Sequence, residues 1–181
     1  MKIKKEVQLK NKKTLLLRDP KISDAKQLLE HLYICASETD FLCAYASDVK
    51  KRTIESEKKW IRDFIKSNNL LIVAEIDGEI IGLAECCFMN STKAKHRGSI
   101  GISIQKKYWN KGIGGVLFDE IIEFAMNTQC TQLELGVIEE NERARHLYER
   151  KGFEYTGRFP RALRFDDGSY HDELMMTKIL R

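Results

Sequence analysis

The sequence predicts an α/β fold. Short apolar runs of strand length alternate along the chain with longer segments whose apolar residues recur at helical spacing. The pair Asp77-Gly78 lies between two of the short runs, and this dipeptide favours a tight hairpin turn. A helical segment, 113–127, then joins the apolar run 97–105 to the apolar run 132–138, as a crossover connection does. These three observations predict an antiparallel meander followed by a crossover.

Three strands and two helices are expected in the first half of the chain. Pro20 closes the first strand, and Ser23 or Asp24 is the expected cap of the first helix, because short polar side chains accept hydrogen bonds from the first helical amides. Thr53 is the expected cap of the second helix. The expected elements are strand 14–18, a helix with the apolar face Ala25, Leu28, Leu29, Leu32 and Tyr33, a helix 53–66, and strands 70–76 and 79–89.

The second half begins with the central strand and ends in a hairpin. Gly152 suits the left-handed position that follows a helix, and Phe153 can then pack back on Leu147 or Tyr148. Turn-forming residues from Asp166 onward separate the last two apolar runs. The expected elements are strand 97–105, helix 113–127, strand 132–138, helix 141–151, and strands 155–165 and 170–179.

Composition is that of a soluble globular protein. The 181 residues fit one domain, 1–181, and no linker, repeat or low-complexity tract divides them. The net charge of +4 is mild compared with the basic surface that nucleic acid requires. No apolar run approaches the length of about 18 residues that spans a membrane, and the first residues are too polar for a signal peptide. We therefore expect a cytoplasmic protein with no nucleic-acid or membrane partner.

Cysteine and histidine do not form a metal-binding pattern. The five cysteines show no ligand spacing, and their number is odd. Without an export signal, reduced thiols are expected. None of the four histidines has a metal-binding neighbour in the sequence, so no metal is expected. The residues concerned are Cys35, Cys43, Cys86, Cys87, Cys130, His31, His96, His146 and His171.

A glycine-bearing turn follows the central strand and precedes the helix 113–127. A helix start leaves about four backbone amides unpaired and carries partial positive charge, so it attracts phosphate. Gly112, Gly114 and Gly115 have no Cβ and would let a ligand approach the main chain. The alternative is a flexible surface turn with solvated lysines. The turn lacks the P-loop pattern, and Leu117 stands where a dinucleotide fingerprint needs its third glycine.

Two segments carry a resemblance to a known family. The segment 109–115, WNKGIGG, resembles the acetyl-CoA pyrophosphate loop of GCN5-related N-acetyltransferases (GNAT), usually written [QR]-x-x-G-x-[GA]. The segment 141–153, NERARHLYERKGF, resembles the N-x-x-A-x-x-L-Y-x-K-x-G-F segment of the same family. They stand in the family's order and at its spacing. Trp109 departs from the pattern, because it occupies the Gln/Arg position.

The resemblance implies a fold and a cofactor. The fold would be a single-domain GNAT fold, a mixed, mostly antiparallel sheet of about seven strands with helices on both faces, with the acetyl-CoA-binding core at about 97–154. Acetyl-CoA would be the cosubstrate. The residues implied to bind it are Ile102, Ser103 and Ile104 through the main chain, Trp109, Asn110, Lys111, Gly112, Ile113, Gly114 and Gly115 in the turn, and Asn141, which is also a suitable helix N-cap.

The family reaction moves acetyl from a thioester to an amine by direct attack in a ternary complex. Tyr148 matches the tyrosine that protonates the departing CoA sulfur, and the alternative is that it only packs beside Leu147. The amine must also lose a proton before it attacks, because an alkylamine has a pKa of about 10.4. Related chains often carry Glu on the central strand, but Ser99 stands there. Glu85 is the candidate base, with Glu38, Asp40 or a water relay as alternatives.

The acceptor stays open at this stage. By analogy with the family, the acceptor side would be lined by Glu38, Asp40, Phe41 and Tyr45, whose carboxylates and aromatic rings suit a cationic amine. A polyamine, an aminoglycoside-like amine, an amino acid or a protein N-terminus would each fit. The arginines of the C-terminal tail, Arg158, Arg161 and Arg164, could instead meet an acidic partner.

Other functions remain as alternatives. A non-catalytic acyl-CoA sensor of the same fold would bind acetyl-CoA without turnover, and a nucleotide-binding α/β protein would prefer NAD or ATP. A ping-pong route through Cys86 or Cys87 is disfavoured, because no histidine lies near them in sequence. Buried packing is the better interpretation of these two thiols. A homodimer is compatible with the family.

Overall fold

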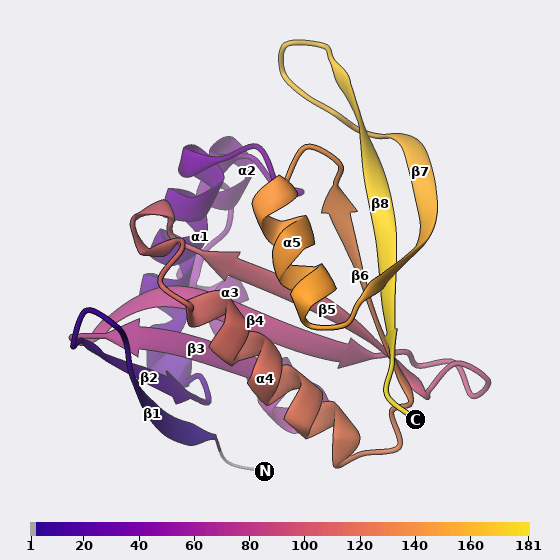
Figure 1. Ribbon diagram of the computed structural model, residues 1–181. Coiled ribbons are helices and arrows are strands. Elements are labelled where there is room, and N and C mark those ends of the chain that lie inside the picture. The colour runs from indigo at the N-terminus through magenta and orange to yellow at the C-terminus, as the bar shows by residue number, and fades with distance from the viewer. Residues whose placement is uncertain (1–2) are drawn as a thin grey trace. The chain divides into compact units, whose positions relative to one another are not determined.

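The computed structural model describes residues 3–181 (Figure 1). The chain has the mixed α/β fold expected from the sequence. The strands are β1 (Lys4–Gln8), β2 (Thr14–Arg18), β3 (Leu70–Ile76), β4 (Glu79–Phe88), β5 (Arg97–Ile104), β6 (Gln132–Ile138), β7 (Glu154–Arg164) and β8 (Tyr170–Ile179). The helices are α1 (Ala25–Glu38), α2 (Ala46–Lys50), α3 (Ile54–Lys66), α4 (Ile113–Met126) and α5 (Glu142–Arg150). Across residues 3–181, no helix is both long and apolar enough to cross a membrane.

The described chain divides into two compact units. The first consists of the described residues up to Cys86 together with Gly101–Ile121, and the second of Cys87–Ile100 together with Ile122–Arg181. The strands β4 and β5 and the helix α4 each contribute residues to both units. Neither unit is one continuous segment. The single domain expected from the sequence stays a prediction.

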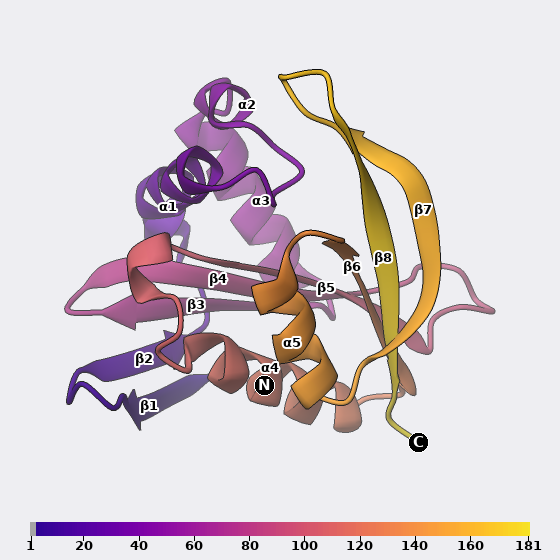
Figure 2. The same ribbon diagram turned by 45° about the horizontal axis from the view of Figure 1, so that its top comes forward.

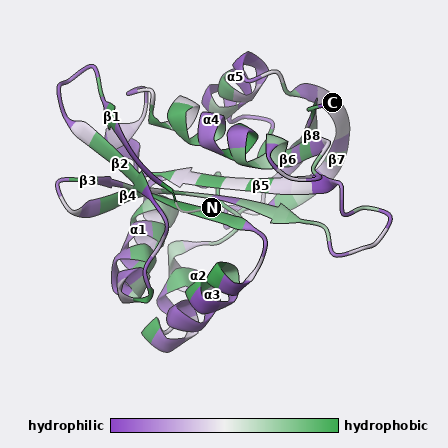
Figure 3. Cartoon of the chain, turned by 90° about the horizontal axis from the view of Figure 1, so that it is seen from below, coloured by the Kyte–Doolittle hydropathy of each residue, from purple (hydrophilic) through white to green (hydrophobic). Residues whose placement is uncertain are grey.

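The first unit contains the meander. Strands β1, β2, β3 and β4 pair in that order, and all three pairs are antiparallel. Asp77 and Gly78 have φ values of 53° and 81°, which is the left-handed backbone that the Asp-Gly hairpin signal predicts. Figure 3 shows α1 and α3 on one face of these strands and the start of α4 on the other. Leu28 of α1, Ile61 of α3 and Val73 of β3 are fully buried in the core between them.

The second unit contains the crossover and the C-terminal hairpin. The beginning of β5 runs parallel to β6, with Arg97 opposite Gln132. Strand β6 pairs antiparallel with β8, and β8 pairs antiparallel with β7. Figure 2 shows β7 and β8 as a long hairpin beside β6. The end of α4 packs on the end of β4 through Phe124 and Phe88, whose ring centroids lie 5.8 Å apart.

Local signals placed most element ends correctly. Thr53 accepts a hydrogen bond from the Ser56 amide at 3.1 Å and caps α3, as predicted. Gly152 has a φ of 79°, and the Phe153 amide donates to the Tyr148 carbonyl at 3.0 Å, which closes α5 as predicted. The first helix differs, because neither candidate cap residue bonds its first amides through a side chain and α1 extends to Glu38.

Two elements were not predicted. Strand β1 is exposed along most of its length, so it lacks the apolar alternation that marks a strand. Strand β1 forms because it pairs antiparallel with β2. Helix α2 has five residues, too few to show helical periodicity. With β1 included, residues 3–181 contain eight strands rather than about seven.

Candidate functional site

The turn between β5 and α4 is built to expose backbone amides. After β5 ends at Ile104, a short 3₁₀ turn leads to Trp109, whose indole Nε1 donates to the Ile104 carbonyl at 2.7 Å. Asn110 and Gly112 then take left-handed backbone conformations, with φ values of 59° and 84°. These two residues reverse the chain so that α4 starts directly after the turn. The indole bond holds the end of the strand close to the beginning of the turn.

The first amides of α4 have no partner within the helix. The Val116 amide donates to the Gly112 carbonyl at 3.2 Å and is the first to close a helical turn. The amides of Ile113, Gly114 and Gly115 precede it and are therefore the orphan donors of the helix start. A cofactor phosphate is the kind of group that such donors bind, because the helix dipole adds partial positive charge at the same place.

Lysines surround this turn and keep their charge near it. The Nζ atoms of Lys107 and Lys111 each lie 5.1 Å from the centroid of the Tyr108 ring. Lys106 lies over Trp109 at 5.9 Å. Lys107 also pairs with Glu79 at 2.9 Å, so part of its charge is neutralised. Lysines resting on aromatic faces are oriented rather than freely solvated, which favours anion binding over the alternative of a featureless surface turn.

A buried histidine supports the strand predicted to hold the pantetheine arm. His31 of α1 is 1% exposed, and its Nε2 lies 2.9 Å from Ser103 Oγ on β5. Burial lowers the pKa of His31 to about 4, so the imidazole is neutral at physiological pH. No functional role was predicted for His31, because a lone histidine on the apolar face of a helix belongs to no motif. Ser103, by contrast, was predicted, together with Ile102 and Ile104.

Glu85 lies over the central strand at a glycine. A Cβ built on Gly101 would come within 2.9 Å of Glu85 Oε1, so the absence of a side chain at Gly101 makes room for this carboxylate. Burial raises the pKa of Glu85 above its ordinary value. A raised pKa is what a general base or acid near neutral pH requires. The role of Glu85 as the base stays a prediction.

The predicted acceptor residues belong to different elements. Glu38 is the last residue of α1, not part of the following loop, and its Oε2 accepts a hydrogen bond from the Lys106 amide at 2.6 Å. It therefore supports the turn between β5 and α4. Asp40 is exposed in the loop, and Phe41 is half-buried there. Tyr45 precedes α2 as its N-cap residue.

The second unit holds the other two predicted residues. Asn141 caps α5, because its Oδ1 accepts a hydrogen bond from the Ala144 amide at 3.3 Å. Tyr148, about two helical turns further along α5, is 7% exposed, and its ring lies 6.4 Å from that of Phe153. Burial raises the pKa of Tyr148 to about 12, although Arg143 opposes the rise. The phenol is therefore protonated at any physiological pH, as a proton donor must be.

The cysteines differ in burial. Cys86 is completely buried and Cys35 and Cys130 nearly so, whereas Cys87 is half-buried and Cys43 is exposed. Burial raises the pKa of Cys35 to about 12, so this thiol is not a nucleophile at neutral pH. Within residues 3–181, no group of three or more His, Cys, Asp or Glu residues could hold a metal ion.

A cavity of about 320 Å³ lies in the first unit, away from the predicted residues. Its walls come from α1, the β3–β4 turn and the end of β5. None of the residues predicted to bind the cofactor or the acceptor lines it, so it is not part of the candidate site. The lining residues are Gln27, Glu30, His31, Ile34, Asp77, Gly78, Glu79, Ile80 and Gln105.

Comparison with known families decides the class of the protein. The model of the "Acetyltransferase (GNAT) family" matches residues 27–153, which include residues of both units. The chain belongs to the GNAT family. The GNAT chain is 30% identical over 110 residues to the L-amino acid N-acetyltransferase AaaT of Escherichia coli K12, a match that covers 60% of this chain and 67% of that protein. The family and this relative establish it as an acyltransferase.

Solved structures confirm the GNAT fold. The acetyltransferase of the GNAT family from Streptococcus pneumoniae superposes with a TM-score of 0.86 at 29% identity, over 91% of this chain and 99% of that one. The structure of yncA from Salmonella typhimurium, solved with its cofactor acetyl-CoA, gives a TM-score of 0.80 over 92% of this chain and 94% of that one. At 17% identity, the second likeness shows the fold alone.

Replacing His31 with Gln should remove a pH-dependent part of the stability of the GNAT chain. Because the pKa of His31 is about 4 when folded and about 6.5 when unfolded, protonation favours unfolding. This histidine adds no pH dependence above pH 6.5, and it costs up to about 3 kcal/mol as the pH falls from about 6.5 to about 4. Glutamine can still bond Ser103 but does not titrate. Urea unfolding at several pH values would measure the difference.

The control for this experiment is His146→Gln, because His146 is exposed on α5. The control should follow the wild type at every pH, and His31→Gln should lose less stability than either in acid. Parallel pH dependence in all three proteins would contradict the neutral, buried state of His31.

Proposed function

We propose that this protein transfers the acetyl group of acetyl-CoA to a primary amine by direct attack within a ternary complex. The observation that carries the proposal is the turn between β5 and α4, where the amides of Ile113, Gly114 and Gly115 are orphan donors beside Lys111. A diphosphate offers oxygens to several amides at once, and each hydrogen bond to a charged group contributes about 1.5–3 kcal/mol. The structure of yncA, which shares the fold, was solved with its cofactor acetyl-CoA, and acetyl-CoA is therefore the ligand that we propose for this turn.

The remaining cofactor contacts are proposed from the family motif. Main-chain groups of Ile102, Ser103 and Ile104 would bind the pantetheine arm. The Asn141 side chain would bind it as well: Oδ1 caps α5, and the amide hydrogens of Nδ2 can donate to a carbonyl. Such donors near the thioester would also stabilise the negative charge that develops on its oxygen.

Tyr148 is proposed as the acid for the departing sulfur. In the unliganded protein its pKa of about 12 lies above an ordinary thiol value of about 8.5, a gap that corresponds to about 5 kcal/mol. Complete proton transfer before the thioester bond breaks is therefore unfavourable. The phenol would instead donate a hydrogen bond to the sulfur and pass its proton as negative charge builds up there.

Glu85 is proposed to accept the amine proton. Its raised pKa makes the carboxylate a stronger base than an exposed glutamate. The proton of an ammonium group, with a pKa of about 10.4, still moves uphill, so the transfer must accompany the attack on the thioester. A water relay is the competing route, and mutation of Glu85 separates the two.

The acceptor is proposed to be a small primary amine or a protein N-terminus. Asp40, Phe41 and Tyr45 would line its side of the site by family analogy. The Escherichia coli relative is an L-amino acid N-acetyltransferase, so L-amino acids are the first compounds to test. A panel of amino acids, polyamines and N-terminal peptides, read by release of free CoA thiol, would identify the class.

Substitution of Gly112 by Ala should weaken acetyl-CoA binding about tenfold, because a non-glycine residue at positive φ costs about 1–2 kcal/mol. An added Cβ would meet no protein atom within 4 Å, so any loss of affinity that arises within the protein must come from the backbone of the turn. Isothermal titration calorimetry with acetyl-CoA gives the affinity. Gly78→Ala is the matched control, because Gly78 has a φ of 81° and equally open space. Both variants should lose stability, but only Gly112→Ala should lose affinity; equal affinities would remove the turn from the cofactor site.

Tyr148→Phe should lower kcat about a hundredfold while leaving the KM for acetyl-CoA within about twofold, because it removes only the proton donor. Steady-state kinetics with a saturating amine gives both constants. The control Tyr170→Phe removes a hydroxyl from an exposed tyrosine of β8 and should behave as the wild type. Unchanged kcat in Tyr148→Phe would assign this ring to packing alone.

Glu85→Gln should lower kcat about a hundredfold and abolish the acidic limb of the pH–rate profile. The wild type should lose activity as the pH falls through the raised pKa of Glu85, above the ordinary value of 4.5, because the protonated carboxyl cannot accept a proton. Glu6→Gln on exposed β1 is the control. A variant that keeps both its rate and its acidic limb would favour the water relay.

A further inference from the structure

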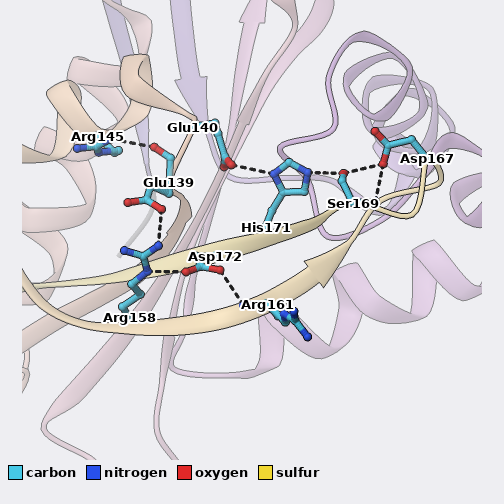
Figure 4. Close-up of polar contacts among 9 residues, drawn as sticks. All are labelled: Glu139, Glu140, Arg145, Arg158, Arg161, Asp167, Ser169, His171 and Asp172. Atoms are coloured by element: carbon cyan, nitrogen blue, oxygen red, sulfur yellow. Dashed lines mark hydrogen bonds and ion pairs between the residues drawn. The ribbon is translucent and has the colours of Figure 1, made fainter.

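The two residues that precede Asn141 are held by the C-terminal hairpin. Figure 4 shows Glu139 and Glu140, in the turn between β6 and α5, facing side chains of β7 and β8. The Glu139 carboxylate pairs with Arg158 at 2.9 Å, and the Glu140 carboxylate lies 2.9 Å from His171 Nδ1. Both contacts lie within the second unit. The position of the turn therefore depends on groups that are distant in sequence.

His171 lies between two oxygen atoms. Its Nδ1 faces Glu140 Oε1, and its Nε2 lies 2.7 Å from Ser169 Oγ. The Ser169 hydroxyl donates in turn to Asp167 Oδ1 at 2.6 Å, and the Ser169 amide donates to the same oxygen at 2.8 Å. The imidazole ring stacks on Phe165, with a centroid distance of 3.8 Å. The ring is thus fixed in orientation, with an oxygen at each nitrogen.

These contacts require both nitrogens of His171 to carry a proton. Ser169 uses its single hydroxyl hydrogen toward Asp167, so His171 Nε2 must donate to Ser169 Oγ. A carboxylate only accepts, so Nδ1 must donate to Glu140. Only the imidazolium form can do both, whereas a neutral imidazole leaves one of the two oxygens facing a lone pair. The same logic excludes a Ser169–His171 nucleophile pair, because the serine proton points to Asp167.

The neighbouring contacts do not change with the protonation of His171. Arg158 bridges Glu139 and Asp172, with 2.5 Å to the latter, and arginine keeps its charge at physiological pH. Arg145 Nη1 donates to the Glu139 carbonyl at 2.8 Å. The charged groups around the ring are therefore Glu140 from the turn and Asp167 from the hairpin tip, which Ser169 connects to the ring. Arg158 with its partners Glu139 and Asp172 completes the set. Among these contacts, those of His171 with Glu140 and Ser169 are the two that depend on a histidine proton.

We propose that His171 in its imidazolium form is a positioning residue, which acts through Glu140 to hold Asn141 in the orientation that binds acetyl-CoA. The connection is short, because Glu140 directly precedes Asn141 in the chain. The Asn141 amide donates to the Ile138 carbonyl at 2.9 Å, and the Asn141 side chain caps α5. When His171 loses its proton, its contact with Glu140 is no longer an ion pair, and because a neutral hydrogen bond is weaker than a charge-assisted one, the turn is held less firmly and Asn141 becomes less ordered. The proposal rests on the proposed function of Asn141 in cofactor binding.

The first test uses the protein without cofactor. NMR would follow the ring of His171 and the side-chain amide of Asn141 between about pH 5 and about pH 8, the range in which histidine changes charge. The two signals should change with a common midpoint. In Glu140→Gln, the Asn141 signal should no longer follow His171. An Asn141 amide that ignores the titration of His171 in the wild type would overturn the proposal.

The second test measures acetyl-CoA affinity by calorimetry at both ends of this range. In the wild type we expect the affinity to fall about fivefold from about pH 5 to about pH 8. Glu140→Gln should bind weakly at both ends, with little pH dependence beyond that of the ligand itself. The matched control is Glu154→Gln on exposed β7, which should follow the wild type. Thermal unfolding of each variant verifies that it is folded.

The outcomes separate this proposal from the proposed function. Equal pH dependence of affinity in the wild type and Glu140→Gln would overturn the role of His171, even if both bind acetyl-CoA. If neither the wild type nor any variant binds acetyl-CoA, the proposed function fails. A common NMR midpoint for His171 and Asn141 would then still support the connection between these two residues.

Discussion

The unsatisfied amides at the start of α4 are the constraint on which the first unit depends. A helix must begin somewhere, and its first donors need water, a side chain or a ligand as partner. Here the two left-handed residues Asn110 and Gly112 bring the chain directly from strand to helix, and Gly112, the residue before α4, has no side chain with which to cap it. The Trp109 indole donates a hydrogen bond to the Ile104 carbonyl and so holds this short turn against the end of β5. The departure from the family pattern at Trp109 thus has a structural role of its own.

Desolvation acts in opposite directions on the pKa values of three side chains. It lowers the pKa of His31 and raises those of Glu85 and Tyr148. All three changes favour the neutral form. For His31 the consequence is an uncharged imidazole that contacts Ser103 within the first unit. In the proposed reaction, the raised pKa would make the Glu85 carboxylate a stronger base, and Tyr148 would lose its proton only as the thioester bond breaks.

The sequence was informative where a short pattern has one physical cause. The Asp77-Gly78 hairpin, the Thr53 cap and the Gly152 helix end each depend on neighbouring residues, and each was predicted correctly. Strand β1 could not be predicted, because it is an exposed edge strand formed by pairing with β2. The contact between His31 and Ser103 joins residues 72 positions apart, and a single sequence does not show which of its strands a helical histidine will face. The roles of Tyr148 and Glu85 came from family resemblance and remain proposals.

In the proposed function, the Asn141 side chain serves folding and ligand binding together. Its carbonyl oxygen is needed by the Ala144 amide, so the orientation of the whole amide group is set by the start of α5. The amide hydrogens on the other side of the group then point in a fixed direction. This arrangement works only if the backbone of the turn is itself fixed, since the cap at 3.3 Å is a long hydrogen bond. The cluster of Glu139, Glu140, Arg158 and His171 supplies that support from the hairpin. A helix cap that is also proposed to bind a cofactor therefore needs a second set of contacts, and in this chain those contacts include the pair between Glu140 and His171.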